Sequence, residues 1–186
     1  MSSLFSKVAF YPTLVYNIFL SKVSSRNWYD RIDETVLLGA LPLRGITKQL
    51  VEEENVRGLV SLTEDFEMSQ FVNSEEEWLK FGVKQLRLQT VDYVGTPTQE
   101  NIHRGVNFIL QHRDQRESVY VHCKAGRTRS ATVVACYLIK ANGWTPEEAV
   151  EFIKTKRSHI WLREKQLKSI DEYYSNWKNF KPMEGA

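Results

Sequence analysis

The chain reads His122-Cys123-Lys124-Ala125-Gly126-Arg127-Thr128-Arg129-Ser130 between two apolar segments. The preceding residues 118–122 form a short β-rich run that is typical of a buried strand. After the stretch, apolar residues recur at positions 133, 134, 137 and 138, which is the spacing of a buried helix. We therefore expect a tight turn that leads from the end of a strand into the N-terminus of a helix.

Such a turn suits phosphate binding, because backbone N–H groups and the helix dipole point at one dianion. Gly126 permits a positive φ and a close approach of phosphate to the backbone. The same field stabilises a thiolate, since thiols at helix N-termini have pKa values of roughly 3.5 to 7.5 instead of about 8.5. We therefore expect Cys123 to be a thiolate nucleophile at neutral pH. The predicted phosphate-binding residues are Lys124, Ala125, Gly126, Arg127, Thr128 and Arg129.

Three side chains of the stretch have expected roles of their own. Arg129 carries the planar fork that holds two phosphate oxygens at once and can follow them into the transition state. Ser130 is placed to donate its hydroxyl to the sulfur when the sulfur becomes a leaving group. We expect His122 to order the loop by hydrogen bonding and not to act as a base. The alternative, a buried structural cysteine in a basic turn, is disfavoured because the turn, dipole and donor requirements coincide.

The leaving oxygen needs a proton, so a carboxylic acid must reach the site from another loop. Asp92 is the candidate general acid, since it follows a predicted strand and lies in residues 90–97, where a glycine and a proline could let the loop close. Aspartate is common in turns, so a solvated loop residue or a helix cap is an equal alternative. Asp65 and Asp114 are the competing candidates.

Short β-rich runs alternate with helical patterns from residue 28 onward, which is typical of an α/β domain. We expect a central mixed, mostly parallel sheet flanked by helices. Gly143 is predicted to end the helix after the cysteine, and Thr145, Pro146 and Glu148 to begin the next with a capping box. The expected strands are residues 36–38, 56–62, 83–88 and 118–122, and further helices are expected over residues 102–110 and 167–177.

Composition limits the class of protein. A chain of 186 residues is expected to form one domain with one core. Lysine and arginine number 25 against 23 acidic residues, which is too even a balance to indicate nucleic-acid binding. The two cysteines, Cys123 and Cys136, form no disulfide framework and no zinc-ligand pattern, so we expect no metal and a reducing compartment.

The N-terminal segment differs from the rest, because its first 27 residues contain no acid around the apolar stretch 8–20. That stretch is too short and interrupted for a transmembrane helix. We expect residues 1–27 to be a mitochondrial targeting or membrane-associating segment, residues 28–178 a catalytic domain and residues 179–186 a flexible tail. A hydrophobic arm that packs on the domain is the alternative, because compositional targeting signals are weak.

The stretch around Cys123 resembles the signature of the cysteine-dependent protein tyrosine phosphatase superfamily in its dual-specificity branch, with a cysteine, five residues, an arginine and a serine. The resemblance extends over nearly the whole chain to the mitochondrial phosphatidylglycerophosphate phosphatases, through residues 10–14, 28–33, 37–43, 54–58, 119–127 and 144–149. It implies a dual-specificity phosphatase fold and a phosphocysteine intermediate. By the same resemblance, Cys123 is the nucleophile, Arg129 the phosphate binder and Asp92 the general acid.

The resemblance also implies a place and a substrate: the matrix side of the mitochondrial inner membrane, and the terminal phosphate of phosphatidylglycerophosphate in cardiolipin synthesis. No cofactor is implied, and we expect a monomer. One segment departs from the family, because its Glu-Glu-Tyr-Glu motif is replaced here by Glu64-Asp65-Phe66-Glu67, which lacks the tyrosine hydroxyl. Thr128 replaces a serine and keeps the hydroxyl.

Two other functions stay open at this point. Lys124 and Arg127 add two cations to the loop and suit a phosphate on a phospholipid, yet a loop alone does not determine the substrate. A dual-specificity phosphatase that acts on phosphoproteins uses the same chemistry. A catalytically silent phosphate-binding scaffold is less favoured, because Cys123, Arg129 and Asp92 are all present.

Overall fold

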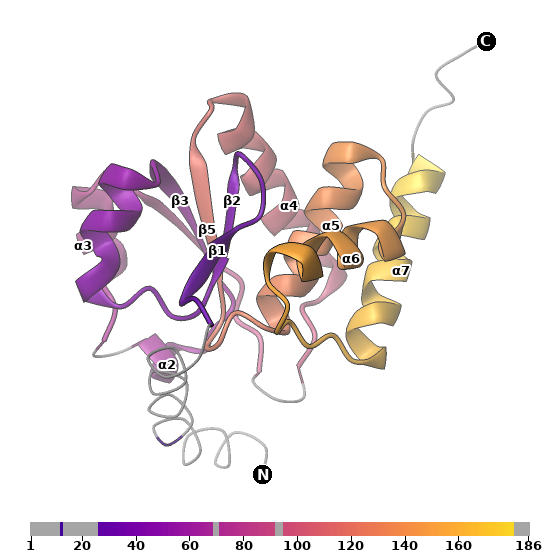
Figure 1. The fold of residues 1–186 in the computed structure, drawn as a ribbon, viewed down its shortest axis with the longest axis horizontal. Coiled ribbons are helices and arrows are strands. Elements are labelled where there is room, and N and C mark those ends of the chain that lie inside the picture. The colour runs from indigo at the N-terminus through magenta and orange to yellow at the C-terminus, as the bar shows by residue number, and fades with distance from the viewer. Residues whose placement is uncertain (1–11, 13–25, 69–70, 92–94, 181–186) are drawn as a thin grey trace.

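A computed structural model describes residues 12, 26–68, 71–91 and 95–180. A five-stranded sheet in the order β1-β2-β5-β3-β4 forms its centre (Figure 1). β1 pairs with β2 in antiparallel orientation and the other pairs are parallel, so the predicted mixed, mostly parallel sheet is confirmed. The strands are β1 (Tyr29–Arg31), β2 (Val36–Gly39), β3 (Val56–Ser61), β4 (Lys84–Arg87) and β5 (Ser118–His122).

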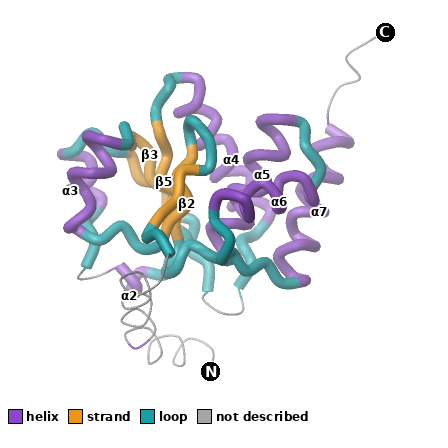
Figure 2. The backbone as a smooth tube through the Cα atoms, in the orientation of Figure 1, coloured by secondary structure: helices purple, strands orange, loops and turns teal. Residues whose placement is uncertain are grey.

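Helices cover both faces of the sheet, with α3 on one face and α4 to α7 on the other (Figures 1 and 2). Two short turns of 3-10 and π type, Arg44–Ile46 and Gln49–Glu53, precede β3. The α-helices are α2 (Asp65–Met68), α3 (Glu75–Lys80), α4 (Gln99–Asp114), α5 (Arg129–Asn142), α6 (Pro146–Lys156) and α7 (Glu164–Phe180).

The central strand β5 is buried throughout and alternates between two cores. Val119 and Val121 face the large core that β2, β3 and helices α4 to α7 also line. Tyr120 points the other way and packs with Leu59 and with Trp78 of α3. Because successive side chains of a strand point to opposite faces, an uninterrupted apolar strand needs helices on both sides.

The register of the parallel strands brings the functional segments together. Gly39 at the end of β2 and Ser61 at the end of β3 both lie beside His122, the last residue of β5. The carboxyl ends of these strands therefore share one edge of the sheet, which is where open α/β sheets bind ligands.

The helix ends agree with the expected signals. Gly143 follows α5 with φ +71° and donates its N–H to the carbonyl of Ile139, which is the predicted left-handed cap. Thr145 and Glu148 form the predicted capping box at the start of α6, with Pro146 as the first helical residue.

Other segments differ from the expectations. The sequence patterns do not predict β1, α2 or α3, and the strand expected over residues 83–88 is limited to Lys84–Arg87. α7 runs to Phe180, so residues 179 and 180 of the expected tail are helical. Asp92, most of the expected segment 1–27 and residues 181–186 lie outside the described residues. Within the described part of the chain, no helix is long and apolar enough to cross a membrane.

Candidate active site

The loop between β5 and α5, residues 123–128, packs tightly against the end of β2. Gly126 has φ +64°, and a Cβ atom there would lie 2.4 Å from the carbonyl carbon and oxygen of Gly39. A side chain at Gly39 would in turn collide with the hydroxyl of Tyr120. Both the conformation and the close approach therefore require glycine at position 126.

Cys123 lies at the base of this loop and is 4% exposed. Burial acts to raise the pKa of its thiol, but the charge of Arg129 opposes this effect. The Ser130 hydroxyl donates to Sγ over 3.3 Å, and backbone N–H groups of Ser130 and Arg127 add to the stabilisation of the thiolate. The net result is that the pKa of Cys123 is lowered, which is the condition for a thiol nucleophile at neutral pH.

The other cysteine has the opposite environment. Cys136 is buried in the middle of α5 among apolar residues. Burial alone raises the pKa of its thiol well above the ordinary value. The two cysteines therefore differ in reactivity, although both are buried.

The guanidinium of Arg129 is held in place from three sides. Its Nη1 donates to the carbonyl of Leu62 over 3.1 Å and to the carbonyl of Thr90 over 2.8 Å. Glu67 binds both ends of the fork, at 2.9 Å from Nη1 and 3.1 Å from Nη2. The two side chains of this ion pair are 3% and 0% exposed. Arg129 is thus fixed before any ligand arrives, so little conformational entropy is lost when it binds phosphate.

Glu67 was not predicted as a site residue. It lies in α2, within the stretch Glu64-Asp65-Phe66-Glu67 whose role the sequence left in doubt. Its carboxylate also accepts the backbone N–H of Glu64, which closes the short turn. Phe66, which stands where the family motif has tyrosine, packs with Leu41 and Val72. The segment therefore contributes a carboxylate that orients Arg129.

His122 is fully buried and is part of a chain of hydrogen bonds. Its Nε2 lies 2.8 Å from Oγ of Ser61, which also accepts from the amide of Gln85 over 2.9 Å. Its Nδ1 lies 3.3 Å from the carbonyl oxygen of Cys123. Burial, assisted by the charge of Arg129, lowers the pKa of His122 to about 3. A neutral ring therefore donates from Nδ1 to Cys123, which orients the start of the loop.

Arg157 supports the loop from its outer side and was also not predicted. Its Nε donates to the carbonyl of Gly126 over 2.8 Å and Nη2 to the carbonyl of Ala125 over 3.2 Å. Asp30 and the carbonyl of Asn27 bind its Nη1. Because the N–H of a trans peptide points opposite to its C=O, these bonds turn two N–H groups toward the inside of the loop.

The other predicted phosphate-loop side chains are those of Lys124, Arg127 and Thr128. Lys124 is buried, and its carbonyl accepts the N–H of Leu41. Arg127 donates through Nε to the carbonyl of His159. Thr128 precedes α5 without a side-chain cap, and its hydroxyl donates to a main-chain carbonyl of the α6–α7 connection.

The three candidate acids are separated by the fold. Asp65 begins α2 and pairs with Arg87 over 2.7 Å. Asp114 ends α4, just before β5, and therefore lies at the opposite edge of the sheet. Asp92 lies outside the described residues and stays the predicted general acid, while Thr90 nearby places the start of its loop against Arg129.

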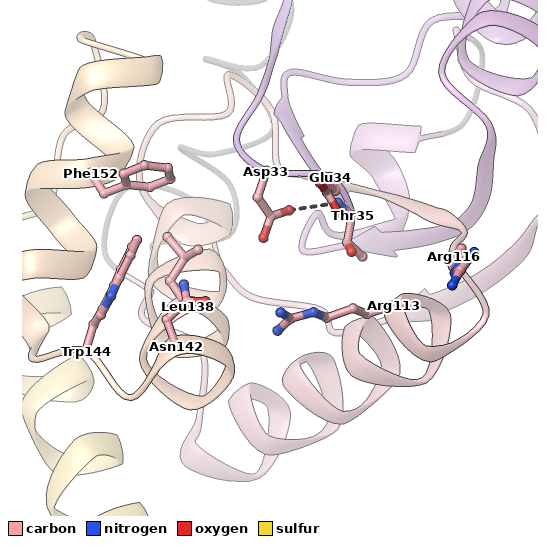
Figure 3. A pocket seen from close by; sticks show the side chains of 9 residues that line it. All are labelled: Asp33, Glu34, Thr35, Arg113, Arg116, Leu138, Asn142, Trp144 and Phe152. Carbon is pink, nitrogen blue, oxygen red and sulfur yellow. Dashed lines mark hydrogen bonds between the residues drawn. The ribbon is translucent and has the colours of Figure 1, made fainter.

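A cavity of about 740 Å³ lies away from this site, near the C-terminal end of α5 (Figure 3). Arg113 and Asp33 approach it from different elements, and Asp33 binds the backbone of Thr35. The residues that line this cavity are Asp33, Glu34, Thr35, Arg113, Arg116, Leu138, Asn142, Trp144 and Phe152.

Among the described residues, no group of histidine, cysteine and acidic side chains could hold a metal ion.

Comparison with known proteins shows the family of the chain. Residues 48–176 match the model of the dual specificity phosphatase catalytic domain. A protein of Rattus norvegicus named "Phosphatidylglycerophosphatase and protein-tyrosine phosphatase 1" is 52% identical over 172 residues, which cover 91% of this chain and 89% of the relative. The Arabidopsis thaliana protein "Phosphatidylglycerophosphate phosphatase PTPMT1" is 37% identical over 91% of this chain and 49% of its own length.

A solved structure extends the similarity to three dimensions. The crystal structure of PTPMT1 in complex with PI(5)P has a TM-score of 0.81 and 51% sequence identity. The superposition covers 82% of this chain and 98% of that one. The predicted dual-specificity phosphatase fold is therefore confirmed.

Proposed function

This chain belongs to the dual specificity phosphatase family and is a cysteine-dependent phosphatase, and from this premise we propose that it hydrolyses the terminal phosphate of phosphatidylglycerophosphate. The observation that carries the chemistry is the buried Cys123, whose pKa is lowered beside the fixed fork of Arg129. The choice of substrate rests on the rat relative, which is 52% identical over most of both chains and whose name includes this activity.

The proposed reaction has two steps. Sγ of Cys123 attacks phosphorus, the bond between phosphorus and the glycerol oxygen breaks, and Asp92 gives that oxygen a proton. A water molecule then attacks the phosphocysteine, and the carboxylate of Asp92 takes its proton while the sulfur leaves as a thiolate. The Ser130 hydroxyl, 3.3 Å from Sγ, stabilises the departing sulfur.

The preorganised donors stabilise the charge that develops on the phosphoryl oxygens. Arg129 can bind two of them through the edge of its guanidinium that carries Nε and Nη2, because Nη1 is held by Glu67 and two carbonyls, while N–H groups of the loop bind the oxygens from the base. Glu67 and the carbonyls of Leu62 and Thr90 prevent the guanidinium from turning away. The enzyme thus needs no metal ion for charge neutralisation in this proposal.

The proposal includes a location. A phospholipid substrate places the enzyme at a membrane surface, and we infer that it works as a monomer on the matrix side of the mitochondrial inner membrane. Residues 1–27, which lack acidic side chains, would direct or attach the chain there, and residues 28–178 would carry the activity. Fusion of residues 1–27 to a fluorescent protein tests this location, because a diffuse signal excludes autonomous import.

The substrate is tested by kcat/KM of the full chain on phosphatidylglycerophosphate in detergent micelles, on a phosphoinositide panel and on a phosphotyrosine peptide. Cys123→Ser is the matched blank for each substrate. We expect phosphatidylglycerophosphate to be preferred about a hundredfold, which is close to 3 kcal/mol of transition-state discrimination. Turnover in Cys123→Ser would contradict the covalent step.

A second candidate function is dephosphorylation of proteins. The rat relative's name also contains "protein-tyrosine phosphatase", so a phosphotyrosine substrate is the alternative to test. If the peptide is preferred, the chemistry at Cys123 stands and the lipid assignment falls.

A further inference from the structure

Exposed apolar side chains gather around the edge of the sheet where the phosphate loop opens. Phe71 follows α2, the helix that carries Glu67, and Val91 follows Thr90, whose carbonyl binds Arg129. Trp161 lies in the connection between α6 and α7. Figure 1 shows α2 and this connection along the same lower edge of the molecule.

The main chain of Trp161 is hydrogen-bonded to the phosphate loop. Its N–H donates to the carbonyl of Arg127 over 2.8 Å, and its carbonyl accepts the hydroxyl of Thr128 over 2.9 Å. The indole nevertheless is 51% exposed. The main chain is therefore fixed beside the site while the ring projects into solvent at its rim.

Two arginines accompany this ring. Cζ of Arg163 lies 3.9 Å from the ring centre, and Cζ of Arg127 lies 5.7 Å from it. Arg163 is exposed, at the start of α7. An exposed indole beside cations matches the headgroup level of an anionic bilayer, where tryptophan is enriched and arginine binds lipid phosphates.

We propose that this edge docks on an anionic phospholipid bilayer, with Trp161 inserted at headgroup level and Arg163 bound to lipid phosphates. The inference rests on the proposed function, because a phosphomonoester on a bilayer lipid can reach Cys123 only if the edge with the phosphate loop faces the membrane. Phe71 and Val91 lie on other segments around Arg129 and extend the apolar rim. The docked orientation brings the lipid headgroup to the loop without extraction of the whole lipid.

The chain provides a matched control. Phe81 is 48% exposed, close to the value for Trp161, but it ends α3 just before the start of β4. It therefore lies at the opposite edge of the sheet, since β4 runs parallel to β3. Phe81→Ala removes a similar apolar area from a face that the proposal turns away from the membrane.

Insertion of the ring is tested by fluorescence of the full chain on vesicles of phosphatidylcholine and phosphatidylglycerol, with and without brominated acyl chains. We expect bromine to quench the wild-type emission and Trp161→Phe to lose most of that quenching. Unchanged quenching in Trp161→Phe would overturn the proposal, even if residues 1–27 hold the protein on the vesicle.

Activity separates this inference from the proposed function. On phosphatidylglycerophosphate in vesicles, we expect Trp161→Ala to lower kcat/KM about tenfold and Arg163→Gln about fivefold, with Phe81→Ala unchanged. On a short-chain, water-soluble form of the same lipid, all three variants should match the wild type within about twofold.

Each other result has a definite meaning. If the wild type fails to hydrolyse the short-chain lipid, the proposed function is wrong. If it hydrolyses that lipid but Trp161→Ala retains full activity on vesicles, only the docking surface is wrong. An equal loss on both substrates in Trp161→Ala also overturns docking, because it places the ring in the site and not at the membrane.

Discussion

The two ends of α5 both have arginines near them, yet only one end is built for an anion. At the N-terminal end, Arg129 and the backbone N–H groups surround Cys123. At the C-terminal end, about 20 Å away along the helix, Arg113 approaches the carbonyl of Ala141. The first end exposes the positive pole of the helix dipole and the second the negative pole.

The acids near each end show the same difference. Glu67 is buried and holds Arg129 in one orientation. In the cavity of Figure 3, Asp33 binds backbone N–H groups and the hydroxyl of Tyr137, and Glu34 is exposed at the rim. Arg113 there interacts with the carbonyl end of α5 itself. An arginine thus makes an anion site only where the helix end and a fixed carboxylate support it.

The largest effect is expected for Arg129→Lys, which keeps the charge and removes the fork. A lysine cannot bind two oxygens in one plane or keep both contacts to Glu67. We expect kcat/KM on p-nitrophenyl phosphate to fall roughly 100- to 1000-fold. A loss below about tenfold would mean that charge alone suffices at this end of α5.

A smaller effect is expected for Glu67→Gln, which keeps the shape and removes the charge that orients Arg129. We expect kcat/KM to fall about 10- to 100-fold and the free energy of unfolding in urea by about 3 kcal/mol, because the buried guanidinium loses its counter-charge. Asp65→Asn is the control in the same helix. Its exposed pair with Arg87 should contribute less than about 1 kcal/mol. Equal effects of the two substitutions would contradict the orienting role of Glu67.

A pH-dependent effect is expected for His122→Asn. The pKa of His122 is lowered to about 3 in the folded protein, below an unfolded value of about 6.5. At pH values between these two pKa values, the unfolded state therefore binds one proton more than the folded state. The stability that the neutral ring contributes is thus present above pH 6.5 and lost as pH falls. The difference in unfolding free energy between wild type and variant should shrink by up to ~1.4 kcal/mol per pH unit below 6.5. Urea titrations at pH 7 and pH 5 measure it, and a constant difference would mean that folding does not change the pKa of His122.

The smallest effect is expected at the other end of α5. Arg113→Gln combined with Arg116→Gln should leave kcat/KM within about twofold and the unfolding free energy within about 1 kcal/mol, since both side chains are exposed. The same assays as above measure both quantities. A loss of activity above tenfold would show that the cavity in Figure 3 is coupled to the phosphate loop.

The central part of the fold could be predicted from the sequence. β5 is an apolar run buried on both faces, and the caps at Gly143 and Thr145 follow local chemistry, so nearby residues suffice to identify them. β1 could not be predicted, because the polar residues Tyr29–Arg31 form a three-residue edge strand that pairs with β2 on one side and owes its other contacts to distant residues such as Arg157 and Glu54. α3 carries a local signal in the sequence, the capping box of Ser74 and Glu77, which marks the start of this short helix.

The residues of the candidate site also fall into two groups, one that the sequence predicts and one that it does not. Cys123, Arg129 and Ser130 lie within one short motif whose spacing reflects the turn. Glu67 and Arg157 act from distant segments, and Glu67 is 62 residues from its partner. A glutamate in a short acidic stretch does not reveal which cation it will meet, because that pairing depends on how β3 and β5 align. Three-dimensional contacts alone identify such residues.

The contact between Arg157 and Asn27 has a practical consequence for anyone who shortens this protein. A chain that begins at Trp28 keeps every residue of the expected catalytic domain, but it loses the carbonyl of Asn27, which accepts from Nη1 of Arg157 over 3.2 Å. A free amino group at Trp28 would also bring a positive charge close to that guanidinium. Truncations and affinity tags are therefore best placed before Arg26, so that the phosphate loop keeps its outer support.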